Sequence, residues 1–406
     1  MTLSAAGAVS EVDSPYAWWR LSISVLISTI GGVGMWSFVV ALPTVQADFG
    51  VLRADASLAY SLLMIGFAVG SVGAGKLADS YGIRPTLILG AAAIGLGYIG
   101  TSYAPSLMLY ALGHLLIGLG TATGFGPLIA DVTHWFERRR GIAVGICSSG
   151  NYVAGALWPP IIQPFIASDG WRVTHLGIGI FCLATLLPLS FLLARRRKFE
   201  HGGTSAQGAA SAFGISPTTL QLLLSIAGVA CCVAMSMPQV HLVAYCSDLG
   251  YGPARGAQML SLMLACGIVS RIVFGSICDR IGGLRTLLLG SILQGTALVL
   301  FLPFDGLVSL YVISALFGLF QGGIVPSYAI IVREFFDRAE AGARVALVIT
   351  ATLFGMALGG WMSGAIFDLT GSYRAAFLNG IAWNLVNVSI ATWLLRRSIG
   401  KLALAR

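Results

Sequence analysis

Long uncharged apolar runs recur along this chain from one end to the other, and they constrain its fold more than any other feature. A helix needs about 20 mostly apolar residues to cross the hydrocarbon core of a bilayer. Of the 406 residues, 57% are hydrophobic and only 10% are charged, a balance that excludes a soluble globular protein of this size. The sequence therefore predicts an all-α membrane protein.

The apolar runs predict twelve transmembrane helices arranged as two six-helix bundles. The twelve spans are residues 21–46, 56–78, 86–102, 107–130, 141–166, 173–194, 218–246, 256–278, 286–303, 307–332, 345–367 and 375–395. We expect bundles over residues 20–194 and 218–396, a Gly/Ser/Ala-rich linker over 195–217, and tails over 1–19 and 397–406. The first apolar run is too long for a removable signal peptide and lacks its small-residue cleavage site.

The distribution of basic residues predicts the orientation in the membrane. If the N-terminus is cytoplasmic, only Arg53, Arg172, Arg255 and Arg374 lie outside and Arg271 lies within the bilayer. The other 24 − 5 = 19 Lys and Arg residues are then cytoplasmic, as the positive-inside rule requires. This rule accounts for the net charge of +8, so we expect membrane lipid and no nucleic acid as a partner. The prediction is a monomeric, multi-pass protein of the cell inner (plasma) membrane with both termini, the linker and the tails in the cytoplasm.

Sequence motifs for catalysis or metal binding are missing. The seven cysteines stand in apolar runs without a CxxC or Cys/His ligand spacing, which favours small core residues over a metal site or a disulfide. No nucleotide-binding loop, HExxH motif or specific Ser/His/Asp set occurs. We therefore expect neither an enzyme nor a cofactor.

The two halves of the chain repeat each other at an offset of 200 residues. The loop from Gly75 to Arg84 contains Asp79, and its echo from Gly275 to Arg285 contains Asp279, where 279 − 79 = 200. The same offset relates Asp48-Phe49-Gly50 to Asp248-Leu249-Gly250 and Trp135-Phe136-Glu137-Arg138 to Phe335-Phe336-Asp337-Arg338, and Pro127 and Pro326 differ by 199. Such a parallel repeat is typical of transporters, which form their site between the halves.

Arg271 is the one charged residue between Gly256 and Cys278. An arginine in mid-membrane costs about 2.5–3.5 kcal/mol on the insertion scale, so it usually faces an interior cavity and has a partner. Its counterpart in the first half is Ser71, so the cation breaks the internal symmetry, as a substrate would and shared packing would not. We predict that Arg271 meets the carboxylate of a transported anion. The alternative is a structural arginine satisfied by backbone carbonyls or polar neighbours.

The repeated loop GxLADxxGxR resembles the signature of the major facilitator superfamily, and this resemblance covers the whole chain. It implies transport by alternating access. It also implies a cytoplasmic gate. In this gate Asp79 and Asp279 pair with Arg138 and Arg338 or with helix ends. The loops that carry the two aspartates end at Arg84 and Arg285, which also belong to the gate. The alternative is that these charges only anchor loops.

The segment from Trp135 to Gly150 is similar to a narrower pattern, that of the monocarboxylate transporter and oxalate/formate antiporter branch. Members of this branch carry an arginine in the eighth span that meets the substrate carboxylate, and Arg271 matches it. The animal members also have an aspartate one turn before that arginine and charged residues in the first span, where this chain has Gly267 and Ile30. The oxalate antiporter has a second cation in the eleventh span, and this chain has none there.

Five further residues are candidates for the substrate site. The resemblance places Trp36, Asn151, Tyr152 and Tyr328 on helices that line the cavity. For the aromatic residues the alternative role is aromatic packing or interface anchoring. His114 lies in mid-span and either lines the path, accepts a proton or is hydrogen-bonded within its bundle.

Together these features predict a secondary active transporter of small monocarboxylates, such as lactate- or pyruvate-like 2-hydroxy or 2-oxo acids, coupled to a proton. One fixed cation in a low-dielectric cavity neutralises one carboxylate. The first alternative is an antiporter that exchanges carboxylates, of the oxalate-formate type. The second is a transport-dead membrane sensor, which the short linker disfavours.

Overall fold

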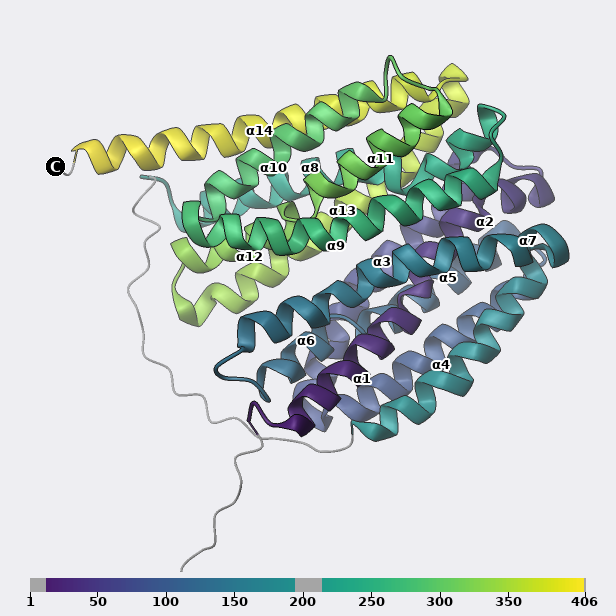
Figure 1. Cartoon of the computed structure of the whole chain (residues 1–406), viewed down its shortest axis with the longest axis horizontal. Coiled ribbons are helices and arrows are strands. Elements are labelled where there is room, and N and C mark those ends of the chain that lie inside the picture. Colours follow the sequence, from purple (N-terminus) through teal and green to yellow (C-terminus); the bar gives the residue numbers. More distant parts are fainter. Residues whose placement is uncertain (1–11, 194–213, 405–406) are drawn as a thin grey trace, which may run out of the picture.

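The computed structural model describes residues 12–193 and 214–404, and every regular element in these ranges is an α-helix (Figure 1). The first half contains α1 (Pro15–Gly31), α2 (Val33–Phe49), α3 (Arg53–Tyr81), α4 (Ile83–Ser102), α5 (Leu107–Thr123), α6 (Gly126–Thr133) and α7 (Arg140–Leu192). The second half contains α8 (Pro217–Asp248), α9 (Pro253–Ile281), α10 (Gly283–Leu300), α11 (Leu307–Gln321), α12 (Ile324–Phe335), α13 (Arg338–Thr370) and α14 (Tyr373–Leu404).

The predicted twelve spans are confirmed. Within the described ranges, eleven helical segments are long and apolar enough to cross a membrane. One of them is α7, which reverses at Gly170, where φ is +79°, and therefore supplies two spans. A glycine suits this corner because a positive φ is strained for residues that carry a Cβ.

The outermost helices extend further than the predicted spans. Ser14 caps α1 by accepting the N–H of Ala17 at 3.2 Å, and Pro15 occupies the first helical turn, where its missing N–H costs nothing. Residues 15–19 therefore belong to the first helix, although the sequence suggested a tail there. Likewise α14 continues to Leu404, into the predicted tail 397–406. Most of the predicted linker, residues 194–213, lies outside the described ranges.

The internal repeat is visible in the backbone. Helices α3 and α9 each have 29 residues and begin at positions 53 and 253. Both end at a glycine with positive φ, Gly82 at +94° and Gly282 at +82°, whose N–H donates to the carbonyl four residues back at 2.8 Å. The fourth span of each half is also broken in the same way, into α5 and α6 and into α11 and α12. These matches confirm the two pseudo-symmetric bundles.

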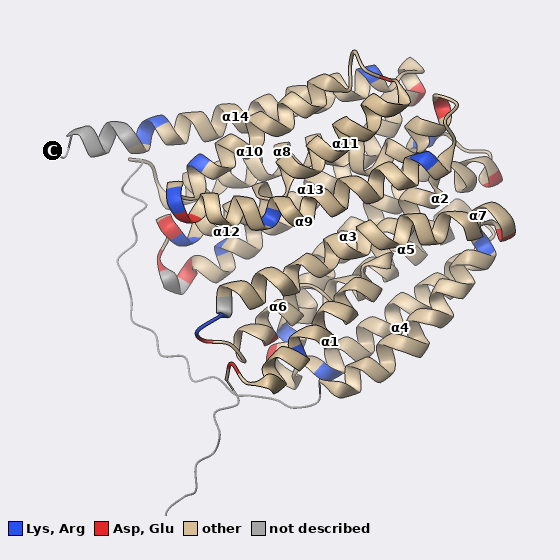
Figure 2. Cartoon of the chain, viewed as in Figure 1, with Lys and Arg blue, Asp and Glu red and all other residues tan. Residues whose placement is uncertain are grey.

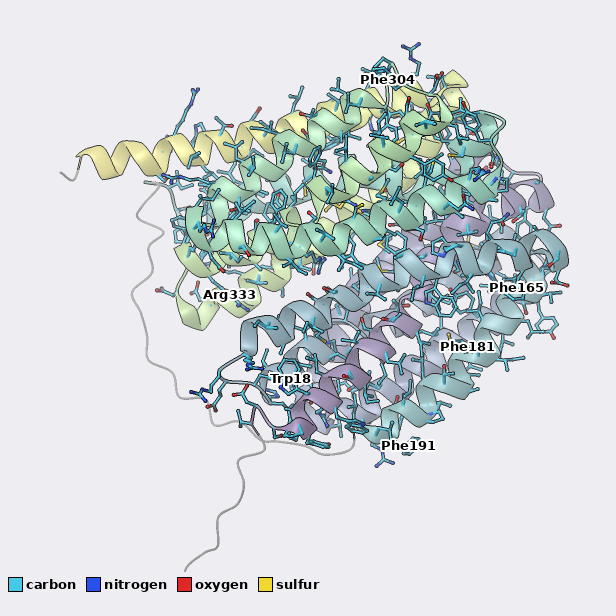
Figure 3. The ribbon with its side chains drawn as sticks, viewed as in Figure 1. Trp18, Phe165, Phe181, Phe191, Phe304 and Arg333 are labelled. Carbon is cyan, nitrogen blue, oxygen red and sulfur yellow. The ribbon has the colours of Figure 1, made fainter. Side chains whose placement is uncertain are left out.

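Two faces of the molecule are needed to describe the site. The terminus face is the end where α1 and α8 begin and where α7 and α14 end (Figure 1). The far face carries the turns α2–α3, α8–α9 and α13–α14 and the corner at Gly170. Charged residues gather near these two faces and leave the middle of the bundles largely uncharged (Figure 2). Trp18, Phe191 and Arg333 lie toward the terminus face, and Phe165 and Phe304 toward the far face (Figure 3).

The two halves meet near the far face and separate toward the terminus face. Near the far face α3 packs on α13: Ser61 Oγ donates to the Ala357 carbonyl at 2.7 Å, and Gly360 faces the ring of Tyr60. Away from this contact the ribbons of the two bundles move apart (Figure 1). The two bundles therefore diverge toward the terminus face.

Candidate functional site

Arg271 lies at the contact between α9 and α7, where the two halves meet. Its Nη1 donates to the Ser148 carbonyl at 3.3 Å, and its guanidinium carbon stands 4.4 Å from the centre of the Tyr152 ring. Its Nε is buried and has no hydrogen-bond partner among the residues that the structure describes. The alternative interpretation, a structural arginine, required backbone carbonyls as partners. The Ser148 carbonyl is such a partner, but it accepts from one of the five N–H groups of the guanidinium. One buried N–H group of the guanidinium, that of Nε, is thus left without an acceptor among the described residues.

Gly267 makes room for the ring that lies against Arg271. It precedes Arg271 by one helical turn, and a Cβ at this position would lie 2.4 Å from Cε1 of Tyr152. Real Cβ atoms do not approach so closely, so any side chain here would displace the ring. The glycine therefore lets Tyr152, from the other half, pack face-on against the guanidinium, a favourable cation–π geometry.

Trp36 and Asn151 lie beside this pair. The Trp36 indole N–H donates to the Asn151 carbonyl at 3.3 Å, which joins α2 to α7. A Cβ on Gly155 would lie 2.7 Å from the Trp36 ring and 2.3 Å from Leu264 of α9, so three helices converge here. Of the six predicted substrate-site residues, the structure thus places Tyr152 against Arg271, with Trp36 and the backbone of Asn151 at the neighbouring contact of α2, α7 and α9.

His114 lies in the core of the first half. Its ring is fully buried, packs against Phe38 and Tyr110, and lies 5.8 Å from the ring of His175. Its Nδ1 must carry the proton, because it donates to the Tyr110 carbonyl at 3.0 Å. Within the described part of the chain its Nε2 has no partner. These contacts all lie within one bundle, so the structure does not bring His114 to Arg271.

Tyr328 lies in the core of the second half. It is fully buried in α12, and its hydroxyl donates to Oδ1 of Asn387 at 2.9 Å. The Asn387 amide in turn donates to the Ser291 hydroxyl at 2.7 Å, which ties α12 to α14 and α10. In this state Tyr328 contributes to a polar network inside its bundle.

The six predicted gating residues all lie near the terminus face. Asp79 and Asp279 occupy the last turns of α3 and α9. Arg84 stacks on Phe191 at 4.4 Å, and Arg285 is exposed in the first turn of α10. Arg338 begins α13, and its side chain is outside the described ones. Their pairing across the halves stays a prediction, for the state closed on this face.

Arg138 is held through its backbone. Its N–H donates to the Asp13 carboxylate at 3.0 Å, and the N–H of Glu137 does so at 3.4 Å. These donors, with Arg138 first, lower the pKa of Asp13. The Asp13 N–H donates to the Trp135 carbonyl at 3.0 Å, so the segment before α1 is tied to the loop that carries Arg138.

Sequence reasoning missed a second cluster that joins the halves, around Arg53 on the far face. The topology rule treats Arg53 only as one of four basic residues that lie outside the membrane, yet its side chain is buried, with 7% of the residue exposed. It forms an ion pair with Asp248 of α8 at 2.5 Å and donates to the Tyr373 hydroxyl of α14 at 2.9 Å. One signal was available, because Asp248 repeats Asp48 at the 200-residue offset.

The comparisons with known proteins agree with this architecture. The family profile described as "Major Facilitator Superfamily" matches residues 24–308 and 224–403 of this chain. Monocarboxylate transporter 13 of Bos taurus is 30% identical over 335 residues, covering 80% of this chain and 75% of the relative. The Rattus norvegicus protein of the same name is 29% identical over the same shares, and monocarboxylate transporter 4 of Gallus gallus is 23% identical over 82% and 72%.

A solved structure supports the fold. It is a bacterial homologue of the human lysosomal transporter Spinster, in an inward-facing and occupied conformation, with a TM-score of 0.69 and 16% identity over 95% of this chain and 96% of that one. The family match, the relatives and the repeat agree with one another. This chain belongs to the Major Facilitator Superfamily, in the branch of the monocarboxylate transporters.

Proposed function

We propose that this chain is a secondary active transporter that moves small monocarboxylates, of the lactate and pyruvate type, by alternating access. The observation that carries the proposal is the geometry of Arg271: a partly buried guanidinium at the contact of the halves, with an unpartnered Nε. A carboxylate binds a guanidinium best through two parallel N–H···O bonds. Since Nη1 already donates to Ser148, the edge formed by Nε and Nη2 is the one that suits this pairing.

The position of Arg271 also suits alternating access. Its guanidinium belongs to the second half, whereas Ser148 and Tyr152 belong to the first. A substrate bound here lies where the halves must move past each other. The single cation fits one carboxylate, and a dicarboxylate would bring a second charge that Arg271 does not neutralise.

Substrate selectivity tests the proposal directly. In proteoliposomes, we expect labelled lactate and pyruvate to be taken up, and dicarboxylates to compete at least about tenfold less well, a difference of about 1.4 kcal/mol. Amide analogues should neither be transported nor compete, because they lack the negative charge. Oxalate outcompeting both monocarboxylates would instead favour the oxalate-formate type of antiporter.

We further propose that transport is coupled to a proton carried by the substrate's own carboxyl group or by His114. The interior of the spans offers no Asp or Glu for this role. An inward proton gradient should then drive accumulation in the same proteoliposomes. Exchange that ignores the gradient would replace symport with antiport.

The terminus face is the cytoplasmic face in our proposal, in an inner (plasma) membrane, and the monomer is the working unit. The structure then represents the inward-open state. A reporter active only in the cytoplasm should function when fused after Lys198 or Arg406, and should fail when inserted at Ser106, before α5, or at Asp305, before α11. The opposite pattern of reporter activity would invert the orientation.

A further inference from the structure

We propose that Arg53 is the residue that latches the far face shut, so that the site around Arg271 opens only to the terminus face. The far-face latch consists of Arg53 from the first half and Asp248, Asp368 and Tyr373 from the second. This inference builds on the proposed alternating access, but it does not depend on which anion is carried.

The latch joins the start of α3 to three helix ends of the other half. Besides its ion pair at 2.5 Å, Asp248 accepts a second bond from Nη2 of Arg53 at 3.3 Å. The carboxylate of Asp368, near the end of α13, accepts the backbone N–H groups of Arg53 at 3.0 Å and Ala54 at 2.7 Å. The Arg53 guanidinium also lies 4.2 Å from the centre of the Phe367 ring. One arginine thus fixes α8, α13 and α14 against α3.

A chain of hydrogen bonds carries the latch inward from the face. His241 Nε2 lies 2.7 Å from the Gly360 carbonyl, which only accepts, so this nitrogen carries the proton. In the neutral ring Nδ1 then accepts from the Tyr373 hydroxyl at 3.0 Å, and the Tyr373 oxygen accepts from Arg53. Gly360 itself faces Tyr60 of α3, where a Cβ would lie 2.8 Å from the ring. The chain therefore ends at the same α3–α13 contact at which it began.

The internal repeat allows this latch to be compared with an ordinary surface ion pair at the equivalent position. Asp48 stands at the same repeat position as Asp248, and it pairs with Arg172 at 3.0 Å. Both of those residues belong to the first half, and the side chains of Arg172 and Asp48 are 40% and 45% exposed. That pair moves as part of one bundle and survives any motion between halves. The Arg53–Asp248 pair links the two bundles, with the Arg53 side chain 8% exposed, and must break before the far face can open.

The two arginines give a matched experiment. Ser61 is 9% exposed at the α3–α13 contact, and a Ser61→Cys reporter should react slowly with a membrane-impermeant maleimide applied to the far face. Arg53→Gln should raise its labelling rate at least about tenfold, equivalent to about 1.4 kcal/mol of lost closure. Arg172→Gln should leave the rate unchanged. The same chain without the reporter corrects for the seven native cysteines, six of which are buried.

Two smaller substitutions test the latch without replacing Arg53, so that the test does not depend on whether Arg53→Gln folds. Asp248→Asn and Tyr373→Phe each remove part of the latch and should also raise the labelling rate, with Tyr373→Phe breaking both the bond from Arg53 and the bond to His241. Equal labelling of the reporter in Arg53→Gln, Asp248→Asn and Arg172→Gln would overturn the latch. So would equal acceleration by Arg53→Gln and Arg172→Gln. Because labelling needs no substrate, a failure of carboxylate uptake would refute the proposed function and leave this result intact.

Discussion

Arg271→Ala should reduce carboxylate uptake to background while the protein still inserts and folds. The variant loses the cation that the proposed site offers to the substrate, and truncating one partner of a buried, hydrogen-bonded charge pair costs about 2–5 kcal/mol of binding. That corresponds to a loss of affinity of roughly 30-fold or more. Folding should survive because the change removes a charge from the membrane interior, where it is costly. Uptake in proteoliposomes, with a thermal melt in detergent, measures both effects.

Two further variants sharpen this result. Arg271→Lys should recover little uptake, because an ammonium lacks the planar fork that binds both carboxylate oxygens and stacks on Tyr152. Arg255→Ala is the matched control on the same helix: Arg255 is exposed near the far face and donates to Gln258 of its own helix, at 3.2 Å. Uptake at the wild-type rate by Arg271→Ala would return this arginine to a structural role.

Asp131→Asn should lower stability strongly. Asp131 of α6 accepts two bonds from Arg20 of α1, at 2.8 and 2.9 Å, and the Arg20 side chain is 1% exposed. Arg20 also donates to the Leu193 carbonyl at 3.4 Å. Removing one partner of a buried ion pair leaves an uncompensated charge and typically costs about 3–5 kcal/mol. The melting temperature in detergent should fall accordingly.

An exposed pair at the same face provides the control for Asp131. Arg344 and Glu340 pair at 2.7 Å within one helix, with Glu340 60% exposed, so Glu340→Gln should cost no more than about 0.5 kcal/mol. The double replacement Arg20→Met with Asp131→Leu should recover much of the stability, because no unpaired charge remains. A melting temperature of Asp131→Asn equal to that of Glu340→Gln would contradict the burial argument.

The spans and the repeat could be predicted because their signals are local and add up along the chain. Twenty apolar residues specify a membrane helix wherever they occur, and the 200-residue offset predicts the match between α3 and α9 that the backbone shows. Arg271 stood out for the same reason, since one charge in an apolar run needs no tertiary knowledge to be noticed. Trp36, Asn151 and Tyr152 could be chosen as candidates because the resemblance to the family places their helices around the cavity.

The missed residues depend on partners distant in the chain. Arg20 and Arg53 counted equally as loop cations under the topology rule, yet each is buried against an aspartate, 111 and 195 residues away. Gly267 was noticed as a departure from the branch, but only the structure shows that the Tyr152 ring fills its space. His114 and Tyr328 stand on the expected helices but point into bundle cores, because helix membership alone does not fix which way a side chain faces.

The cap of α3 has a consequence for what counts as a domain in this molecule. The residue before α3 is Leu52, which offers no side-chain acceptor, and the first two N–H groups of the helix are satisfied by Asp368 from the other half. Where such acceptors are missing, the first N–H groups of a helix must hydrogen-bond to water. The first half expressed as a separate fragment would therefore begin its second span with solvent-facing, fraying amides. The start of a helix in one repeat is thus completed by a carboxylate of the other repeat, so the boundary between the two bundles runs through the cap of α3.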